Sequence, residues 1–165
     1  MSAEKRLKAL GIELPPAPPP AGLYIPAVVS NGLLFVSGQV PLRDGQPMSR
    51  GKCGAGLTAD DAVPLARQCA LQALAVVRAE LGSLDRVVRV VRVGGFVASA
   101  PNFNEQPKVI NGASQLLVDL FGEEGKHARA AVGVAELPLG VPVEVEFLFE
   151  IRPAKRPKKP RKKKK

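Results

Sequence analysis

The sequence predicts an α+β domain with the element order ββ-α-β-α-ββ, in which a mixed sheet carries both helices on one face. Three observations predict this architecture. Two apolar runs flank the dipeptide Asn31-Gly32, which is typical of a tight β-hairpin turn. Two later segments repeat apolar residues at helical spacing. Residues 141–152 alternate apolar and polar side chains, as a strand does when one of its faces lies in a core.

The first half of the chain is expected to hold an arm, the hairpin and a helix. In the arm, residues 1–22, we expect a short helix at 3–10 followed by an extended proline-rich link. The hairpin strands are predicted at 25–30 and 33–37, and the glycine-rich residues 41–57 as a loop. The helix should begin near Asp60 or Asp61, whose charges suit a helix N-terminus. Pro64 would then lie in its first turn, and Gly82 would cap its end.

The second half should add three strands and another helix. Residues 86–99 predict a strand bent at Gly94-Gly95, and a helix is expected from about Gln106 until Gly122 stops it. The last strands are predicted at 129–137 and 141–152. If these form a hairpin, Arg129 and Glu144 lie about 15 Å apart, at ~3.3 Å per residue. A site using both side chains would then need two subunits, and we expect the second face of the sheet to pack on another subunit.

The charge of the chain is concentrated at its C-terminus. Of 24 basic residues, nine lie in residues 153–165, which contain none of the 15 acidic residues. The rest of the chain is therefore neutral overall, and the tail is predicted to be disordered. Such a tail is a possible nucleic-acid contact through phosphates, or simply a solubilising end.

Composition argues against several classes of protein. No apolar run is long enough for a transmembrane helix, so no membrane partner is expected. The charged N-terminus is not a signal peptide, which favours a cytoplasmic protein. Cys53, Cys69 and the single histidine, His127, suggest neither a disulfide framework nor a zinc site, and no cofactor or metal is expected. His127 is read either as a catalytic residue or as an ordinary residue at the end of a strand.

One arginine stands out because it opens a run of small and apolar residues that reads as a buried strand. Ala131 and Gly133 share the strand face of Arg129 and leave space beside it, while Val132 and Val134 should point the other way and fasten the strand to the core. A guanidinium is a rigid, always charged fork that matches a carboxylate bidentately. This pattern predicts a site for a small carboxylate.

Other single polar residues interrupt apolar elements. Glu144 lies on the polar face of the last strand, and Ser37 ends the second hairpin strand. Asn111 lies in the second helix, and Tyr24 is the only tyrosine. Each can also be explained without a functional role, as a solvated strand residue or an outward-facing helix residue.

Four motifs resemble the Rid superfamily, the reactive-intermediate deaminases of the RidA/YjgF type, also called L-PSP endoribonuclease-like proteins. They are VSGQVP at 36–41, VING at 109–112, ARAAVGVAELP at 128–138 and VEVEF at 143–147. The resemblance spans residues 23–152 and indicates a divergent branch. It implies a chorismate-mutase-like fold in a homotrimer with inward-facing sheets and clefts between subunits. It also implies a 2-iminobutanoate/2-iminopropanoate deaminase-like hydrolase, which converts 2-imino acids to 2-oxo acids and ammonia without a cofactor.

The resemblance assigns roles to individual residues. It implies that Arg129 clamps the substrate carboxylate and Glu144 holds the attacking water. The substrate-binding positions that it implies are Tyr24, Ser37, Gly38, Asn111 and Ala131. Two features depart from the family pattern: Ala131 stands where a cysteine is frequent, and residues 22–26 read GLYIP rather than Gly-Pro-Tyr-x-Gln.

Two other functions stay open at this point. The first is RNA binding or endoribonuclease-like cleavage, for which His127 and Arg129 are the only candidate acid–base pair. The second is a trimer that binds small carboxylates without catalysis.

Overall fold

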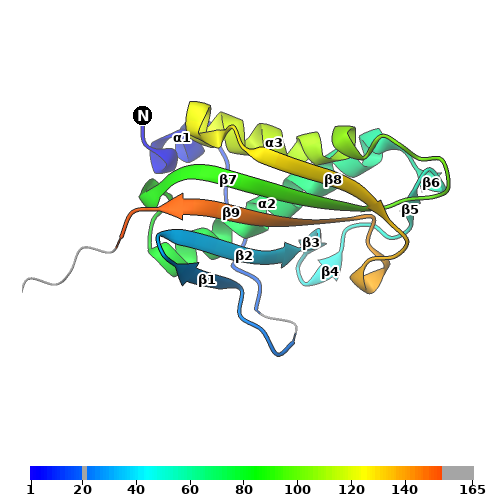
Figure 1. Cartoon of the computed structure of the whole chain (residues 1–165), viewed down its shortest axis with the longest axis horizontal. Helices are drawn as coiled ribbons and strands as arrows, with labels where there is room; N and C mark the ends of the chain where they lie inside the picture. Colours follow the sequence, from blue (N-terminus) through cyan, green and yellow to red (C-terminus); the bar gives the residue numbers. More distant parts are fainter. Residues whose placement is uncertain (20–21, 154–165) are drawn as a thin grey trace, which may run out of the picture.

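The computed structural model describes residues 1–19 and 22–153, which form a five-stranded mixed sheet covered on one face by two long helices (Figure 1). The strand order is β1-β2-β9-β7-β8. The sheet strands are β1 (Ala27–Ser30), β2 (Leu33–Gln39), β7 (Val87–Ala98), β8 (Ala128–Val134) and β9 (Val143–Ile151), and the helices are α2 (Ala59–Leu81) and α3 (Gln106–Phe121). The predicted α+β class and element order are confirmed.

The hairpin forms where its turn residues predict it. β1 and β2 pair antiparallel up to Ser30 and Leu33. The two turn residues between them, Asn31 and Gly32, have φ angles of 48° and 78°. Such left-handed backbone matches the twist of tight hairpins and favours asparagine and glycine.

The last two strands do not form the expected hairpin. β9 runs antiparallel between β2 and β7, whereas β8 pairs parallel with β7 at the edge of the sheet. The reason is that α3 connects β7 to β8, and a helical crossover places its two strands parallel. β8 is therefore an exposed or half-buried edge strand, and the prediction of a buried strand is wrong.

Helix α2 begins slightly earlier than predicted. Thr58 caps it, and Asp61 completes a capping box: the Asp61 N–H donates to Thr58 Oγ1 at 3.2 Å, and the Thr58 N–H donates to Asp61 Oδ2 at 2.8 Å. Because the helix starts at Ala59, Pro64 is its sixth residue and lies in the second turn rather than the first. There it removes one backbone hydrogen bond, and the capping box holds the start of the helix in place.

The core lies between the sheet and the two helices, and glycines let the layers approach closely. A Cβ at Gly112 of α3 would overlap the carbonyl oxygen of Val63 in α2, and one at Gly95 of β7 would overlap Ile110 of α3. Gly94 faces the opposite side, against the Glu146 side chain. The irregularities in the pairing of β7 with β9 lie nearer its start, between Val87 and Arg92. The pair Gly94-Gly95 thus serves close packing rather than the predicted bend.

The short helix expected in the N-terminal arm is present as α1 (Ala3–Ala9). Its Ala3 and Leu7 are buried in the main core, and Glu4 accepts hydrogen bonds from Arg78 and from the Leu84 N–H. Helix α1 is thus packed against the domain, beside α3 (Figure 1). The basic tail, from residue 154 onward, lies outside the described residues.

The remaining elements are short and connect the main ones. The predicted loop at 41–57 contains four strands of two residues, and three 3-10 turns lie in other connections. They are β3 (Leu42–Arg43), β4 (Gln46–Pro47), β5 (Lys52–Cys53), β6 (Gly56–Leu57), η1 (Leu84–Arg86), η2 (Gly122–Gly125) and η3 (Pro138–Gly140).

Candidate functional site

Arg129 lies at the open edge of a row of core residues. On β8 it is opposite Val93 of β7, which in turn is opposite Phe147 of β9, and both of these are buried. Arg129 itself stays exposed because it lies on the edge strand. Its guanidinium reaches α3, where Nη1 donates to Asn111 Oδ1 at 2.8 Å and to Ser114 Oγ at 3.1 Å. The structure thus brings Arg129 and Asn111, two of the predicted site residues, into contact.

Ser114 connects Arg129 to the only histidine. The Ser114 hydroxyl lies 3.0 Å from His127 Nε2, and His127 Nδ1 lies 2.6 Å from the carbonyl oxygen of Gly125. Burial lowers the pKa of the half-buried His127, and the positive charge of Arg129 lowers it further, against the opposing effect of the Gly125 hydrogen bond. Sequence analysis missed Ser114, although it follows Asn111 by three residues and so shares its helix face.

The space beside Arg129 differs from the predicted open floor. A Cβ at Gly133 would lie 2.9 Å from Gln106 Nε2 and 3.1 Å from Ser99 Oγ, so these two side chains occupy that space. Ala131 packs partly against the core. Val132 is 45% exposed on the opposite face, so the prediction that it fastens the strand to the core is wrong.

Glu144 points away from Arg129. Its neighbours Val143 and Val145 are fully buried under the helices, so Glu144 faces the other side of the sheet, opposite Phe96 of β7. Burial raises the pKa of the half-buried Glu144 carboxyl, and the negative charge of Glu146 raises it further. A carboxyl group with a raised pKa can take and return a proton nearer neutral pH.

The other predicted residues gather where β2 departs from regular pairing, between Val36 and Gln39. Ser37 Oγ donates to the Ile25 carbonyl oxygen at 2.9 Å. Gly38 adjoins the Glu144 carboxylate so closely that a Cβ there would overlap it. Gly38 and Tyr24 line one small hollow of about 70 Å³.

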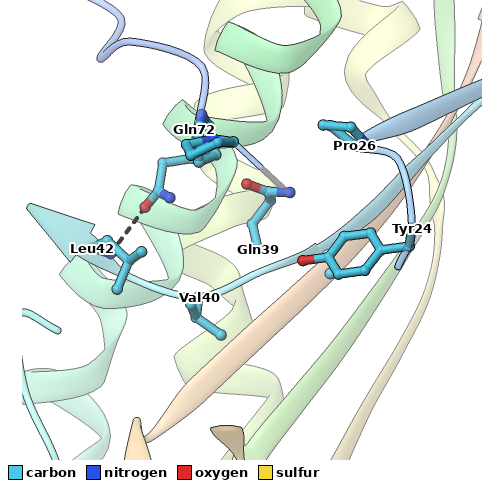
Figure 2. A pocket seen from close by; sticks show the side chains of 9 residues that line it. Tyr24, Pro26, Gln39, Val40, Leu42 and Gln72 are labelled. Atoms are coloured by element: carbon cyan, nitrogen blue, oxygen red, sulfur yellow. Dashed lines mark hydrogen bonds between the residues drawn. The ribbon is translucent and has the colours of Figure 1, made fainter. Parts of the chain in front are cut away.

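Figure 2 shows how this hollow is built. Tyr24 and Pro26 approach from the segment before β1, while Gln39 and Val40 come from the end of β2. Gln72 of α2 closes it, and its side-chain oxygen accepts a hydrogen bond from the Leu42 N–H at 3.0 Å. Gln39 and Gln72 are buried polar residues that sequence analysis did not single out.

Apart from Ala131, the predicted residues therefore fall into two clusters that lie apart within one chain, and Ser114 joins one of them. We call Arg129, Asn111, Ser114 and His127 the arginine cluster. Glu144, Gly38, Ser37 and Tyr24 are the glutamate cluster. Glu144 and Arg129 differ by two strands and three residues in register, which is roughly 14 Å at ~4.8 Å per strand and ~3.3 Å per residue, and they face opposite sides of the sheet.

Two further properties apply to residues 1–19 and 22–153. No helix there is both long and apolar enough to cross a membrane. No three His, Cys, Asp or Glu side chains come together there as a set of metal ligands.

Comparison with known proteins gives one matching family model and many relatives. The model described as "YjgF/chorismate_mutase-like, putative endoribonuclease" matches residues 4–151. Protein TCP17 of Trypanosoma cruzi is 51% identical over 146 residues, which are 88% of this chain and 91% of that protein. A Dermatophagoides farinae protein named 2-iminobutanoate/2-iminopropanoate deaminase is 31% identical over 140 residues, 85% of this chain and 94% of its own length.

Solved structures show the same fold at high coverage. Protein Atu1372 of Agrobacterium tumefaciens superposes with a TM-score of 0.84 at 45% identity, covering 91% of this chain and 92% of that one. A Shewanella oneidensis protein titled as a putative endoribonuclease gives a TM-score of 0.87 at 32% identity, covering 92% and 100%.

Proposed function

Because the chain belongs to the YjgF/chorismate-mutase-like family, we propose that it hydrolyses 2-imino acids to 2-oxo acids and ammonia. The observation that carries this proposal is the arginine cluster. Nη1 of Arg129 is held by Asn111 and Ser114, and the side chain is exposed, so its remaining N–H groups can receive a carboxylate. The relative named as an imine deaminase supports the same reaction class.

The reaction needs little beyond positioning and one acid–base group. The imine carbon is electrophilic, so water adds to it once Arg129 holds the substrate by its carboxylate. Glu144 takes a proton from that water and passes it to the nitrogen, which gives a carbinolamine. Glu144 then takes the proton of the new hydroxyl group and delivers it to the nitrogen, so that the carbon–nitrogen bond breaks and ammonia and the 2-oxo acid leave. General acid–base catalysis of this kind contributes about 10²–10⁴-fold in rate.

The two clusters can act together only across a subunit boundary. Within one chain, Glu144 and Arg129 face opposite sides of the sheet. We therefore place the site in a cleft of a homotrimer, with Arg129 from one subunit and Glu144 from the next. Apolar side chains exposed on the Glu144 side of the sheet, Phe35 at 47% and Val132 at 45%, support contact with another copy.

Steady-state hydrolysis of 2-iminobutanoate, generated in the assay, tests the reaction. Arg129→Ala and Glu144→Gln should each lose activity, while truncation after Arg152 should keep it. Lys126→Ala is the matched control, because its exposed ammonium pairs with Glu123 outside both clusters. Absence of turnover by the wild type would contradict the proposed reaction, and turnover that is undiminished in Arg129→Ala and in Glu144→Gln would contradict the roles given to these two residues.

Mixed oligomers test the shared site. An oligomer of either variant alone, Arg129→Ala or Glu144→Gln, lacks one of the two catalytic groups at every interface. When the two variants are co-expressed and assemble at random, intact Arg129 meets intact Glu144 at about one interface in four, so about a quarter of wild-type activity should return. Light scattering gives the number of subunits. Inactive mixed oligomers would contradict a site shared between chains.

The second candidate is RNA binding or cleavage, which the endoribonuclease wording of the family description favours. The contacts of His127, the candidate base, argue against RNA cleavage, because both of its ring nitrogens already lie within hydrogen-bond distance of protein groups. RNA affinity that falls steeply with salt and disappears after truncation at Arg152, without imine hydrolysis, would favour this candidate. Binding of 2-oxobutanoate without turnover would instead indicate a non-catalytic carboxylate-binding protein.

A cytoplasmic location is also part of the proposal. Imaging of the tagged chain in cells tests it. Mitochondrial fluorescence would contradict it.

A further inference from the structure

We propose that Ser114 and His127 are positioning residues that set which edge of the Arg129 guanidinium meets the substrate. His127 acts as a neutral ring with its hydrogen on Nδ1 and accepts the Ser114 hydroxyl hydrogen. The Ser114 oxygen is thereby left to accept from Arg129. This inference rests on the proposed function, because it concerns the carboxylate that Arg129 is proposed to bind.

The direction of each hydrogen bond follows from the groups present. The Gly125 carbonyl can only accept, so His127 Nδ1, 2.6 Å away, must carry a hydrogen. A neutral ring then has a bare Nε2, which can only accept, and the Ser114 hydroxyl 3.0 Å away is its donor. Arg129 can only donate, so the Ser114 oxygen accepts from Nη1 at 3.1 Å. Every group in the chain of contacts therefore has one defined role.

The two groups that contact the His127 ring, those of Ser114 and Gly125, are both held by α3. Ser114 is part of α3 itself. Gly125 is buried against the same helix, where an added Cβ would overlap the Leu117 carbonyl oxygen and lie 2.8 Å from the Val118 Cα. The carbonyl that orients His127 therefore cannot move independently of the helix that carries Ser114.

The consequence for Arg129 is a fixed orientation. Both hydrogens of Nη1 are used, one by Asn111 and one by Ser114, which lie on one face of α3. The edge made by Nε and Nη2 stays available, and two parallel N–H groups match the two oxygens of a carboxylate. Without Ser114, a single acceptor would let the guanidinium plane rotate.

Binding of 2-oxobutanoate, measured by calorimetry, tests the energetic part. Ser114→Ala and His127→Gln should each weaken binding about five-fold, comparable to one ordinary hydrogen bond. Combined with Arg129→Ala, neither should weaken it further by more than about two-fold, since coupled residues are non-additive. Ser114→Thr, which keeps the hydroxyl, should restore affinity. Gln115→Ala is the matched control, because Gln115 pairs with Asp119 on the exposed side of α3.

Nitrogen NMR tests the tautomer directly, and the single histidine makes its signals unambiguous. At neutral pH, Nδ1 should carry the hydrogen and Nε2 should be bare. Ser114→Ala should keep this tautomer, because the Gly125 carbonyl still binds Nδ1, and should shift the Nε2 signal, because Nε2 loses its donor. A hydrogen on Nε2 in the wild type would overturn the inference. So would wild-type affinity in Ser114→Ala and His127→Gln while Arg129→Ala abolishes binding, an outcome that leaves the proposed function intact. Undiminished binding by Arg129→Ala would instead overturn the proposed function.

Discussion

Replacing Gly112 by alanine should destabilise the protein, although alanine is the better helix former. Glycine within a helix costs about 1 kcal/mol relative to alanine. In α3, however, an added Cβ at Gly112 would overlap the Val63 carbonyl oxygen, with the Arg67 backbone nitrogen of α2 only 3.2 Å away. These are backbone atoms within a helix, so no side chain can rotate to make room.

The expected magnitude follows from these two opposing effects. Overpacking of a core costs about 1–3 kcal/mol, and contact with rigid backbone places Gly112→Ala at the upper end. After the gain in helix propensity, we expect a net loss of about 2 kcal/mol in unfolding free energy. For a chain of this size, that loss lowers Tm by about 4–8 °C.

Urea unfolding followed by circular dichroism measures this difference. Gln115→Ala is the control, since it also places an alanine in α3 but at an exposed site, and it should leave stability nearly unchanged. Because Gly112 follows Asn111, the displacement of α3 should also weaken 2-oxobutanoate binding at Arg129. If Gly112→Ala is as stable as the wild type, the helices are not in the close contact that we describe.

Three further predictions concern single residues. In Gly38→Ala, the added Cβ would overlap the Glu144 carboxylate and displace this flexible side chain. We expect kcat for imine hydrolysis to fall at least ten-fold with little change in Tm, and an unchanged kcat would contradict the catalytic role of Glu144. The folded-state pKa of Glu144 is raised, so the wild type should lose stability as pH rises from the unfolded pKa through the folded one, and Glu144→Gln should lack this loss in urea unfolding across pH 4–8. Equal pH dependence of the two proteins would count against a raised pKa. Thr58→Ala should cost about 1 kcal/mol by removing the cap of α2, and an unaltered urea midpoint would show that the capping box adds nothing.

Local signals predicted individual elements well. Asn31-Gly32 specified the hairpin because its left-handed backbone is set by neighbouring residues alone. Gly122 marked the end of α3 for a similar reason. The position of β8 depended instead on pairing between distant segments. Nothing within residues 129–137 distinguishes a hairpin partner of β9 from a parallel neighbour of β7.

The candidate site shows the same difference between local signals and contacts between distant segments. Contact between Arg129 and Asn111 is consistent with the roles that the family resemblance implies. The positions of Ser99 and Gln106 beside Gly133 could not be predicted, because they depend on how α3 crosses the sheet. Ser114 and His127 lie only 13 residues apart, yet their contact requires η2 to fold back against α3.

The central position of β9 has a consequence for how the chain folds. β9 follows every other element of the sheet in sequence, yet it lies between β2 and β7, and its central residue Phe147 pairs with both. Until β9 has been synthesised, the β1–β2 hairpin and the β7-α3-β8 unit share no strand and each presents an unpaired edge. The sheet can therefore close only late in synthesis, through contacts between distant segments, which predicts slow folding and an aggregation-prone nascent chain.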